Sequence, residues 1–196
     1  MWDDWHILQK EHARMLNLKF TDSGLLPPGD YNMSFEMLRT SILVLGPPNG
    51  DEPNWDIKWR FHLVNNLEIM TKQLWEVGIT EIFIDGSFVS NKPHPNDIDG
   101  YFVCDLMKYV TGEIERELNK LDPNKIWTWD PNSRRSCKGF AKKQLPMWHK
   151  YRVELYPEYG QSFGVLDEHG QPLLFPSAFR KERYTKEPKG IIKIVK

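Results

Sequence analysis

Two aspartates separated by one residue, Asp97 and Asp99 in "NDIDGYF", form the most specific chemical pattern in the sequence. The apolar residues around them are typical of a β-strand, in which residues i and i+2 lie on the same face about 6.5 to 7 Å apart. Two carboxylates so close repel each other unless a cation lies between them. Mg²⁺ (or Mn²⁺) suits such a pair because it prefers oxygen ligands and takes water or phosphate oxygens in its remaining positions. The pair therefore predicts a metal site that also holds a phosphorylated ligand.

Gly86 and Ser87 end the preceding apolar run, in "IFIDGS", and supply the complement to such a metal site. Glycine lets the backbone turn sharply and approach a phosphate closely. Serine offers a backbone N–H and a hydroxyl to phosphate oxygens. The connection "FVSNKPHPN" is long enough to fold back beside the aspartates, and its two prolines limit its freedom. We therefore predict that Gly86, Ser87 and Lys92 bind the phosphates of a ligand such as a metal-bound triphosphate.

Simpler structures compete for the same segment. Asp85-Gly86 alone suits a type I′ hairpin turn, although such a turn does not account for the paired aspartates. A calcium loop would need more oxygen-bearing residues at alternate positions and a closing glutamate, which the segment lacks. Asp97 alone would serve as a turn residue that bonds its own backbone. His94, in the same connection, is either a phosphate contact or an ordinary loop histidine.

Hydrophobic periodicity predicts the elements that must position these residues. The longest predicted helix spans residues 54–78, with Asn54 as its cap and Gly78 as its stop. Further helices are predicted over residues 3–18, 34–45 and 106–121, and strands over residues 80–84, 97–104, 150–157 and 190–196. This mixture predicts an α/β (α+β) fold in which a small mixed β-sheet packs with helices.

Length and composition predict one domain without a membrane partner. The 196 residues suit a domain over residues 25–196, preceded by a helical N-terminal extension over residues 1–24. The net charge is −1 and no apolar run approaches the length of a membrane span, so any polyanionic partner must be bound by a local patch. The N-terminus lacks a signal-peptide pattern, and the two cysteines fit neither a disulfide framework nor a zinc site. We expect a cytoplasmic protein.

The segment "IDGSFVSNKPHPNDID" resembles the signature of the polymerase-beta-like nucleotidyltransferase superfamily: an apolar strand, Gly-Ser, a spacer, then Asp-apolar-Asp. The wider sequence, from "GLLPPGDY" through the long helix to the ending "EPKGIIKIV", resembles a bacterial and phage family of small single-domain members of that superfamily. The resemblance covers most of residues 24–195. It implies a nucleotidyltransferase-type sheet in which Gly86 and Ser87 bind nucleotide phosphates and Asp97 and Asp99 ligate metal ions.

Such enzymes take a third carboxylate from a neighbouring strand, and Glu154 in "YRVELYP" is the candidate. It would ligate one metal ion and help to deprotonate the incoming hydroxyl. The alternation in that strand gives Glu154 a face shared with Arg152, and hence a partner charge. The sequence departs from the superfamily pattern at Gly100, where an apolar residue is usual, and at Glu154 itself, where aspartate is frequent.

A basic segment, residues 134–152, carries Lys and Arg without any acidic residue and is flanked by Trp127, Trp129 and Trp148. It is either a solvated loop or a surface that holds a triphosphate or RNA phosphates. The tryptophans would stack on a base in the second case, although core packing is their more frequent role.

These patterns favour a Mg²⁺-dependent nucleotidyltransferase that moves a nucleoside monophosphate from an NTP to a protein side chain, a tRNA end or a small molecule. The first alternative is an inactive protein of the same fold that senses nucleotides or binds a protein or RNA, for example in a toxin–antitoxin or phage-defence system. The second is RNA binding through the basic segment without catalysis, which predicts binding that weakens steeply with salt.

Overall fold

The computed structural model describes residues 18–47, 54–167 and 169–196. Its main sheet has the strand order β1 (Asp30–Met33), β7 (Ile191–Ile194), β2 (Ile82–Asp85), β3 (Ile98–Val103) and β4 (Val153–Glu158). β1 pairs with β7 and β3 with β4 in parallel, whereas β2 pairs with both of its neighbours in the antiparallel direction. The predicted α/β (α+β) fold with a small mixed sheet is thus confirmed.

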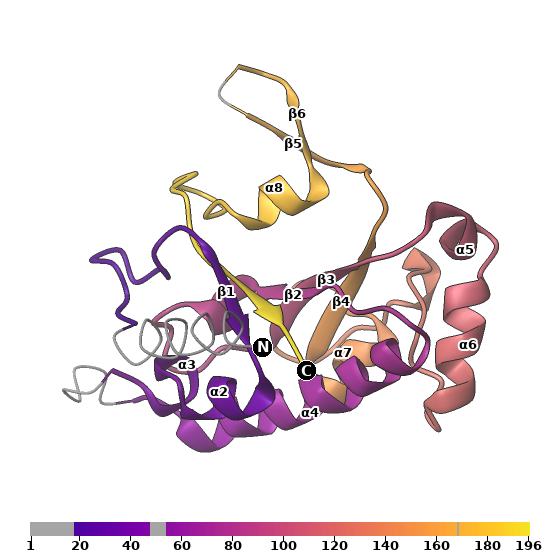
Figure 1. Ribbon diagram of the computed structural model, residues 1–196, viewed down its shortest axis with the longest axis horizontal. Helices are drawn as coiled ribbons and strands as arrows, with labels where there is room; N and C mark the ends of the chain where they lie inside the picture. The colour runs from indigo at the N-terminus through magenta and orange to yellow at the C-terminus, as the bar shows by residue number, and fades with distance from the viewer. Residues whose placement is uncertain (1–17, 48–53, 168) are drawn as a thin grey trace, which may run out of the picture.

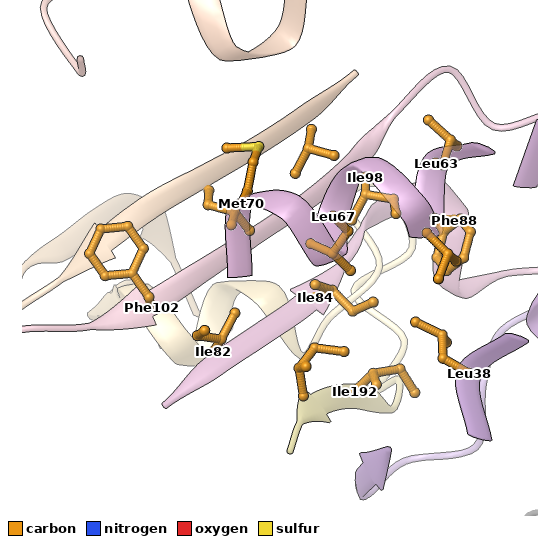
Figure 2. Packing of buried hydrophobic residues seen from close by; sticks show 14 of the residues in the cluster. Leu38, Leu63, Leu67, Met70, Ile82, Ile84, Phe88, Ile98, Phe102 and Ile192 are labelled. Carbon is orange, nitrogen blue, oxygen red and sulfur yellow. The ribbon is translucent and has the colours of Figure 1, made fainter. Parts of the chain in front are cut away.

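One long helix, α4 (Ile57–Glu76), packs along one face of the sheet (Figure 1). Its Leu63, Leu67 and Met70 are fully buried and recur at helical spacing, and they meet the inward side chains of the sheet (Figure 2). Asp56, rather than the predicted Asn54, caps this helix, because its carboxylate accepts a hydrogen bond from the backbone N–H of Trp59 (2.9 Å).

Two helices predicted as continuous are each broken into a pair. Ser34 caps α2 (Phe35–Thr40) at the start of the helix predicted over residues 34–45, but Ser41 then adopts an extended conformation and caps a separate helix, α3 (Ile42–Leu45). Residues 106–121 form α5 (Leu106–Val110) and α6 (Glu113–Leu121), because Gly112 between them takes a left-handed conformation with φ of 69°. In both cases a local capping residue overrides a hydrophobic pattern that continues through it.

The remaining elements follow β2, precede β4 or lie on the face of the sheet opposite α4. They are the 3₁₀ turns η1 (Gly86–Val89) and η2 (Pro131–Ser133), α7 (Pro146–Tyr151), the hairpin β5 (Ser162–Leu166) and β6 (Pro172–Leu174), and α8 (Phe175–Phe179). α8 and the hairpin lie on the side of the sheet away from α4 (Figure 1). There Phe175 packs with Phe83, Tyr101 and Ile191 in a second, smaller core. This second core leaves the neighbouring end of the same face to the polar residues of the candidate site.

Several predicted elements need adjustment or lie outside the described residues. The strand predicted over residues 150–157 begins only at Val153, because Tyr151 ends α7 and Arg152 adopts a left-handed backbone with φ of 55°. The helix predicted over residues 3–18 lies outside the described residues except for Leu18, which is buried in the main core. The boundary predicted between residues 24 and 25 stays a prediction. Within the described ranges, no helix combines the length and the apolar character that crossing a membrane requires.

Candidate functional site

A row of carboxylates crosses three adjacent strands of the main sheet. Asp85, the last residue of β2, is the cross-strand partner of Asp99 in β3, and Asp99 is in turn the partner of Glu154 in β4. Directly paired residues share a face of the sheet, and Asp97 shares it because it precedes Asp99 by two positions. The structure thereby brings together Asp97, Asp99 and Glu154, the three acidic residues that the sequence singles out. It adds Asp85 to them.

The Gly-Ser corner lies against this row. Gly86 begins η1 with φ of 75°, and a Cβ atom placed on it would be 2.5 Å from Oδ2 of Asp99. Glycine is therefore required twice, for its left-handed backbone and for the close approach of the carboxylate. Ser87 and Gly86 both keep partial exposure, so solvent or a ligand reaches the corner beside Asp99.

Gly86→Ala is expected to destabilise the protein by about 2–4 kcal/mol, because the methyl group adds a steric clash to the cost of the left-handed backbone. Urea denaturation measures the change. Gly160→Ala is the matched control, since Gly160 also has a positive φ (91°) but nothing within 4 Å of its Cβ position. Equal losses in the two variants would contradict the close approach of Gly86 to Asp99.

Crowding of the carboxylates raises their pKa values. Burial is the largest cause of the raised pKa of Asp99, about 8, and the negative charges of Asp97, Glu154 and Asp85 add to it. Burial also raises the pKa of Asp97, with a further increase from Glu154 and opposing effects from its hydrogen bond to Trp148 and from nearby cations. Burial and like charges thus disfavour the ionised form of these carboxylates when no cation is bound. A bound cation would lower both pKa values.

Two cations and an indole flank Asp97. Trp148 Nε1 donates a hydrogen bond to Asp97 Oδ2 (2.6 Å), and the Arg152 guanidinium lies 3.7 Å from the centre of the Trp148 ring. Lys92 and Arg152 both act on Asp97 by charge, since each lowers its pKa. Lys92, predicted to bind phosphate, is exposed on the connection and lies on the Asp97 side of the site. A phosphorylated ligand at the aspartates would thus meet positive charge at this end.

Glu154 is buried and its oxygens are held by protein donors. The backbone N–H of Leu145 donates to Oε1 (3.0 Å), and the Tyr156 hydroxyl donates to Oε2. The cation that pairs with Glu154 is Arg134 (3.6 Å) and not the expected Arg152, because Arg152 lies in the turn before β4 and stacks on Trp148 instead. In this conformation Leu145, Tyr156 and Arg134 hold the Glu154 carboxylate. Its role as third metal ligand stays a prediction.

The donor set fits a metal ion held in part by its ligand. Among the residues that the structure describes, no three His, Cys, Asp or Glu side chains are grouped to hold a metal ion by themselves. Mg²⁺ is commonly bound by one or two carboxylates together with water and substrate phosphates. Asp97, with one oxygen free of the Trp148 bond, and the adjacent Asp99 supply such a pair next to the Gly86 corner.

Sequence reasoning missed the ion pair of Asp85 with Lys189. Lys189 Nζ lies 2.7 Å from Asp85 Oδ2, and both side chains are almost fully buried. The other oxygen, Oδ1, is buried without a hydrogen-bond partner among the described residues. Burial raises the pKa of Asp85 to about 6, against the lowering effect of Lys189. Asp85 was visible in "IFIDGS" as a turn residue, but its pairing with Asp99 and with a lysine far along the chain depends on strand register.

The tryptophans near the basic segment pack in the protein and do not form a stacking surface. Trp127 and Trp148 are fully buried, and Trp127 Nε1 donates to Gln73 Oε1 (2.6 Å). Trp129 Nε1 donates to the Leu155 carbonyl (2.8 Å). The basic segment itself is tied to the site, because Arg134 pairs with Glu154. Its exposed cations are Arg135, Lys138, Lys142, Lys143 and Lys150.

Comparison with known proteins identifies a family for this chain. A family of unknown function, DUF6932, matches residues 18–195, which is nearly the whole sequence. The chain belongs to this family. Neither the search of curated proteins nor the search of solved structures found a match. The DUF6932 description carries no activity, so the function of the site is argued from its geometry and charge.

Proposed function

We propose that this DUF6932 protein is a Mg²⁺-dependent nucleotidyltransferase of the polymerase-beta-like superfamily. It would transfer a nucleoside monophosphate from an NTP to an acceptor hydroxyl. The single observation that carries the proposal is the approach of the Gly86 corner to Asp99, with Asp97 on the same face. In this proposal the Gly86 corner binds phosphate, and it lies next to the two carboxylates that would hold the metal. Neither a hairpin turn nor a surface acidic loop accounts for both.

The proposed roles follow from the contacts. Asp97 and Asp99 hold the metal, which when bound neutralises triphosphate charge and polarises the α-phosphorus. Gly86 and Ser87 seat the β- and γ-phosphates through the turn, and Lys92 adds a cation on the Asp97 side. The acceptor oxygen forms a bond to the α-phosphorus as the bond to the β-phosphate oxygen breaks, and pyrophosphate leaves.

Glu154 is proposed to receive the acceptor proton or to assist the metal, as the third carboxylate of the row. Both of its oxygens accept hydrogen bonds from Leu145 and Tyr156, so either role requires at least one of these donors to release it. Its location beside Asp99, as the cross-strand partner, supports the assignment. Of the two donors, the Tyr156 hydroxyl belongs to a side chain, whereas the Leu145 N–H belongs to the backbone.

The acceptor is proposed to be a protein side chain, a tRNA end or a small molecule. The exposed lysines of residues 134–152 adjoin the site through Arg134 and would attract an anionic acceptor. The unpaired Cys104 and Cys137 are consistent with the reducing cytoplasm, where we place the protein.

Incubation of the protein with NTPs labelled at the α- or the γ-phosphate, Mg²⁺ and fractions of cell protein, tRNA and small metabolites tests the proposal. We expect label from the α-phosphate alone to become attached to one fraction, and to disappear with Asp97→Asn. Transfer of the γ-label would indicate a kinase and contradict the proposal. Absence of transfer to every fraction, together with absence of NTP binding, would also contradict it.

A second candidate, an inactive nucleotide-sensing or protein- or RNA-binding module, is favoured by one observation. The oxygens of Glu154 are engaged by Leu145, Tyr156 and Arg134, which is the arrangement of a structural carboxylate. Tyr156→Phe separates the two candidates, because it frees Glu154 Oε2. The enzyme predicts a change in the rate of transfer, whereas the inactive module predicts no transfer in either protein.

A further inference from the structure

The fully buried Arg60 on α4 belongs neither to the hydrophobic core nor to the carboxylate row. Its guanidinium donates to the carbonyls of Leu43 (2.5 Å), Phe88 (2.9 Å), Ser90 (3.2 Å) and Lys92 (2.5 Å), which it reaches from one helical position. The last three carbonyls belong to the connection of residues 86–97, which joins the Gly-Ser corner to the aspartates. The Arg60 side chain therefore donates to every second backbone carbonyl from Phe88 to Lys92.

A buried arginine in this location needs a reason, because removing a charge from water is costly. Within the described ranges, no carboxylate forms an ion pair with Arg60, and its guanidinium lies 3.9 Å from the centre of the Trp55 ring. Burial lowers its pKa to about 9, so it remains a cation at neutral pH. The connection turns inward, with the Phe88 side chain in the main core (Figure 2), and its inward carbonyls need donors. The planar guanidinium has enough N–H groups to satisfy them together.

The preceding turn of the same helix holds the second half of the connection. Trp59 Nε1 donates to the Pro95 carbonyl (2.6 Å), and the Trp59 ring stacks on the His94 imidazole at 5.3 Å. The backbone N–H of Asp56 donates to the Pro93 carbonyl (3.1 Å), and the Asp56 carboxylate bonds His94 Nδ1 (3.0 Å). The start of α4 thus contacts the connection from Phe88 to Pro95, immediately before Asp97.

We propose that Arg60 and Trp59 are positioning residues of the nucleotide site: they hold residues 88–95 so that Gly86, Lys92 and Asp97 converge. The proposal rests on the proposed function for its ligand. Arg60 is fully buried and Trp59 is partly buried, so we expect neither side chain to contact that ligand. Their effect is on the conformation of the connection, which without them would exchange among several arrangements in which the corner and the aspartates lie apart.

Two variants and one control test this role. Arg60→Lys keeps the charge but loses the planar set of donors that reaches four carbonyls. Trp59→Phe keeps an aromatic ring and loses the donor to the Pro95 carbonyl. Because Trp59 is only partly buried, we expect this variant to fold. Arg39→Lys is the matched control, because Arg39 joins α2 to Glu68 and Asn65 of α4 without contacting the connection.

The first measurement is hydrogen–deuterium exchange, followed by mass spectrometry of peptides over residues 86–97. We expect exchange of the hydrogen-bonded amides of residues 88–92, such as Asn91 N–H, which donates to the Gly24 carbonyl (2.8 Å), to accelerate at least about tenfold in Arg60→Lys and to a smaller extent in Trp59→Phe. Each variant loses hydrogen bonds that hold the carbonyls of the connection in place. Peptides of β2, β3 and the centre of α4 should exchange as in the wild type, and Arg39→Lys should leave residues 86–97 unchanged. Unchanged exchange of the connection in the folded variants would overturn the proposal.

The second measurement is the affinity of each protein for each NTP in the presence of Mg²⁺. Each protein is measured at a temperature that lies the same number of degrees below its own melting temperature. We expect Kd to rise about tenfold or more in Arg60→Lys, less in Trp59→Phe, and not at all in Arg39→Lys. A wild-type Kd in variants whose connection exchanges faster would overturn the positioning role. If the wild type binds no NTP, the proposed function fails, and exchange alone decides whether these residues hold the connection. If Arg60→Lys does not fold, Trp59→Phe decides both measurements.

Discussion

Asp99→Asn is expected to make the metal-free protein more stable at alkaline pH while it removes binding of Mg²⁺ and nucleotide. Burial and the neighbouring charges of Asp97, Glu154 and Asp85 raise the folded-state pKa of Asp99 to about 8, whereas an unfolded chain has the ordinary value. The folded protein therefore binds more protons than the unfolded chain between about pH 4 and pH 8, and its stability decreases as pH rises through this window. Asparagine removes that loss.

Urea denaturation with EDTA from pH 4 to pH 9 measures the effect. Asp99→Asn should exceed the wild type by about 2 kcal/mol or more at pH 9, and the difference should disappear toward pH 4. Mg²⁺ with NTP should stabilise the wild type at pH 8 and leave Asp99→Asn unchanged. Asp22→Asn, at an exposed position, is the control and should follow the wild type. A difference that grows toward acid pH would contradict the assigned charge state.

Gly100→Ala is expected to destabilise the protein by about 3 kcal/mol or more, because a Cβ atom there would be 2.3 Å from the backbone carbonyl of Phe83. That carbonyl belongs to β2 and cannot rotate away, so the methyl group must separate β2 from β3. The same separation would pull Gly86 from Asp99. Thermal and urea denaturation measure the loss, with Gly160→Ala as the control in open space. A loss below 1 kcal/mol would contradict the close contact of the two strands.

The close contact of β2 and β3 explains why Gly100 departs from the pattern of the superfamily that the sequence resembles. An apolar side chain at this position would have to enter the core between β2 and Leu155, where the distance leaves no room for even a methyl group. The departure is therefore a consequence of close strand packing in this chain and is located on the core side of β3. It leaves the row of carboxylates on the other face intact.

The sequence predicted what depends on local spacing. The alternation in "NDIDGYF" places Asp97 and Asp99 on one face of a strand, and the strand over residues 80–84 ends at the Gly-Ser corner in the structure as well. Periodicity also predicts the helix of residues 54–78. Its true cap, Asp56, lay two residues beyond the predicted Asn54, because either side chain is a suitable cap and only the geometry selects one.

The remaining parts of the site depend on long-range pairing. Lys189 meets Asp85 only because β7 inserts beside β2, an arrangement that no local pattern encodes. Arg134 rather than Arg152 pairs with Glu154, because Arg152 lies in a left-handed turn that ends α7. Arg60 lies on a helix whose pattern predicts only amphipathicity, and its role is visible only when its carbonyl partners are in place.

Asp97, Asp99 and the Gly86 corner are proposed to form one metal–triphosphate site. Isothermal titration of each NTP, with and without Mg²⁺, into the wild type and into Asp97→Asn/Asp99→Asn tests it most directly. We predict heat of binding for at least one NTP that requires Mg²⁺ and is absent in the double variant, which should remain folded. Binding that persists in the double variant, or no binding of any NTP to the wild type with Mg²⁺ present, would contradict the claim.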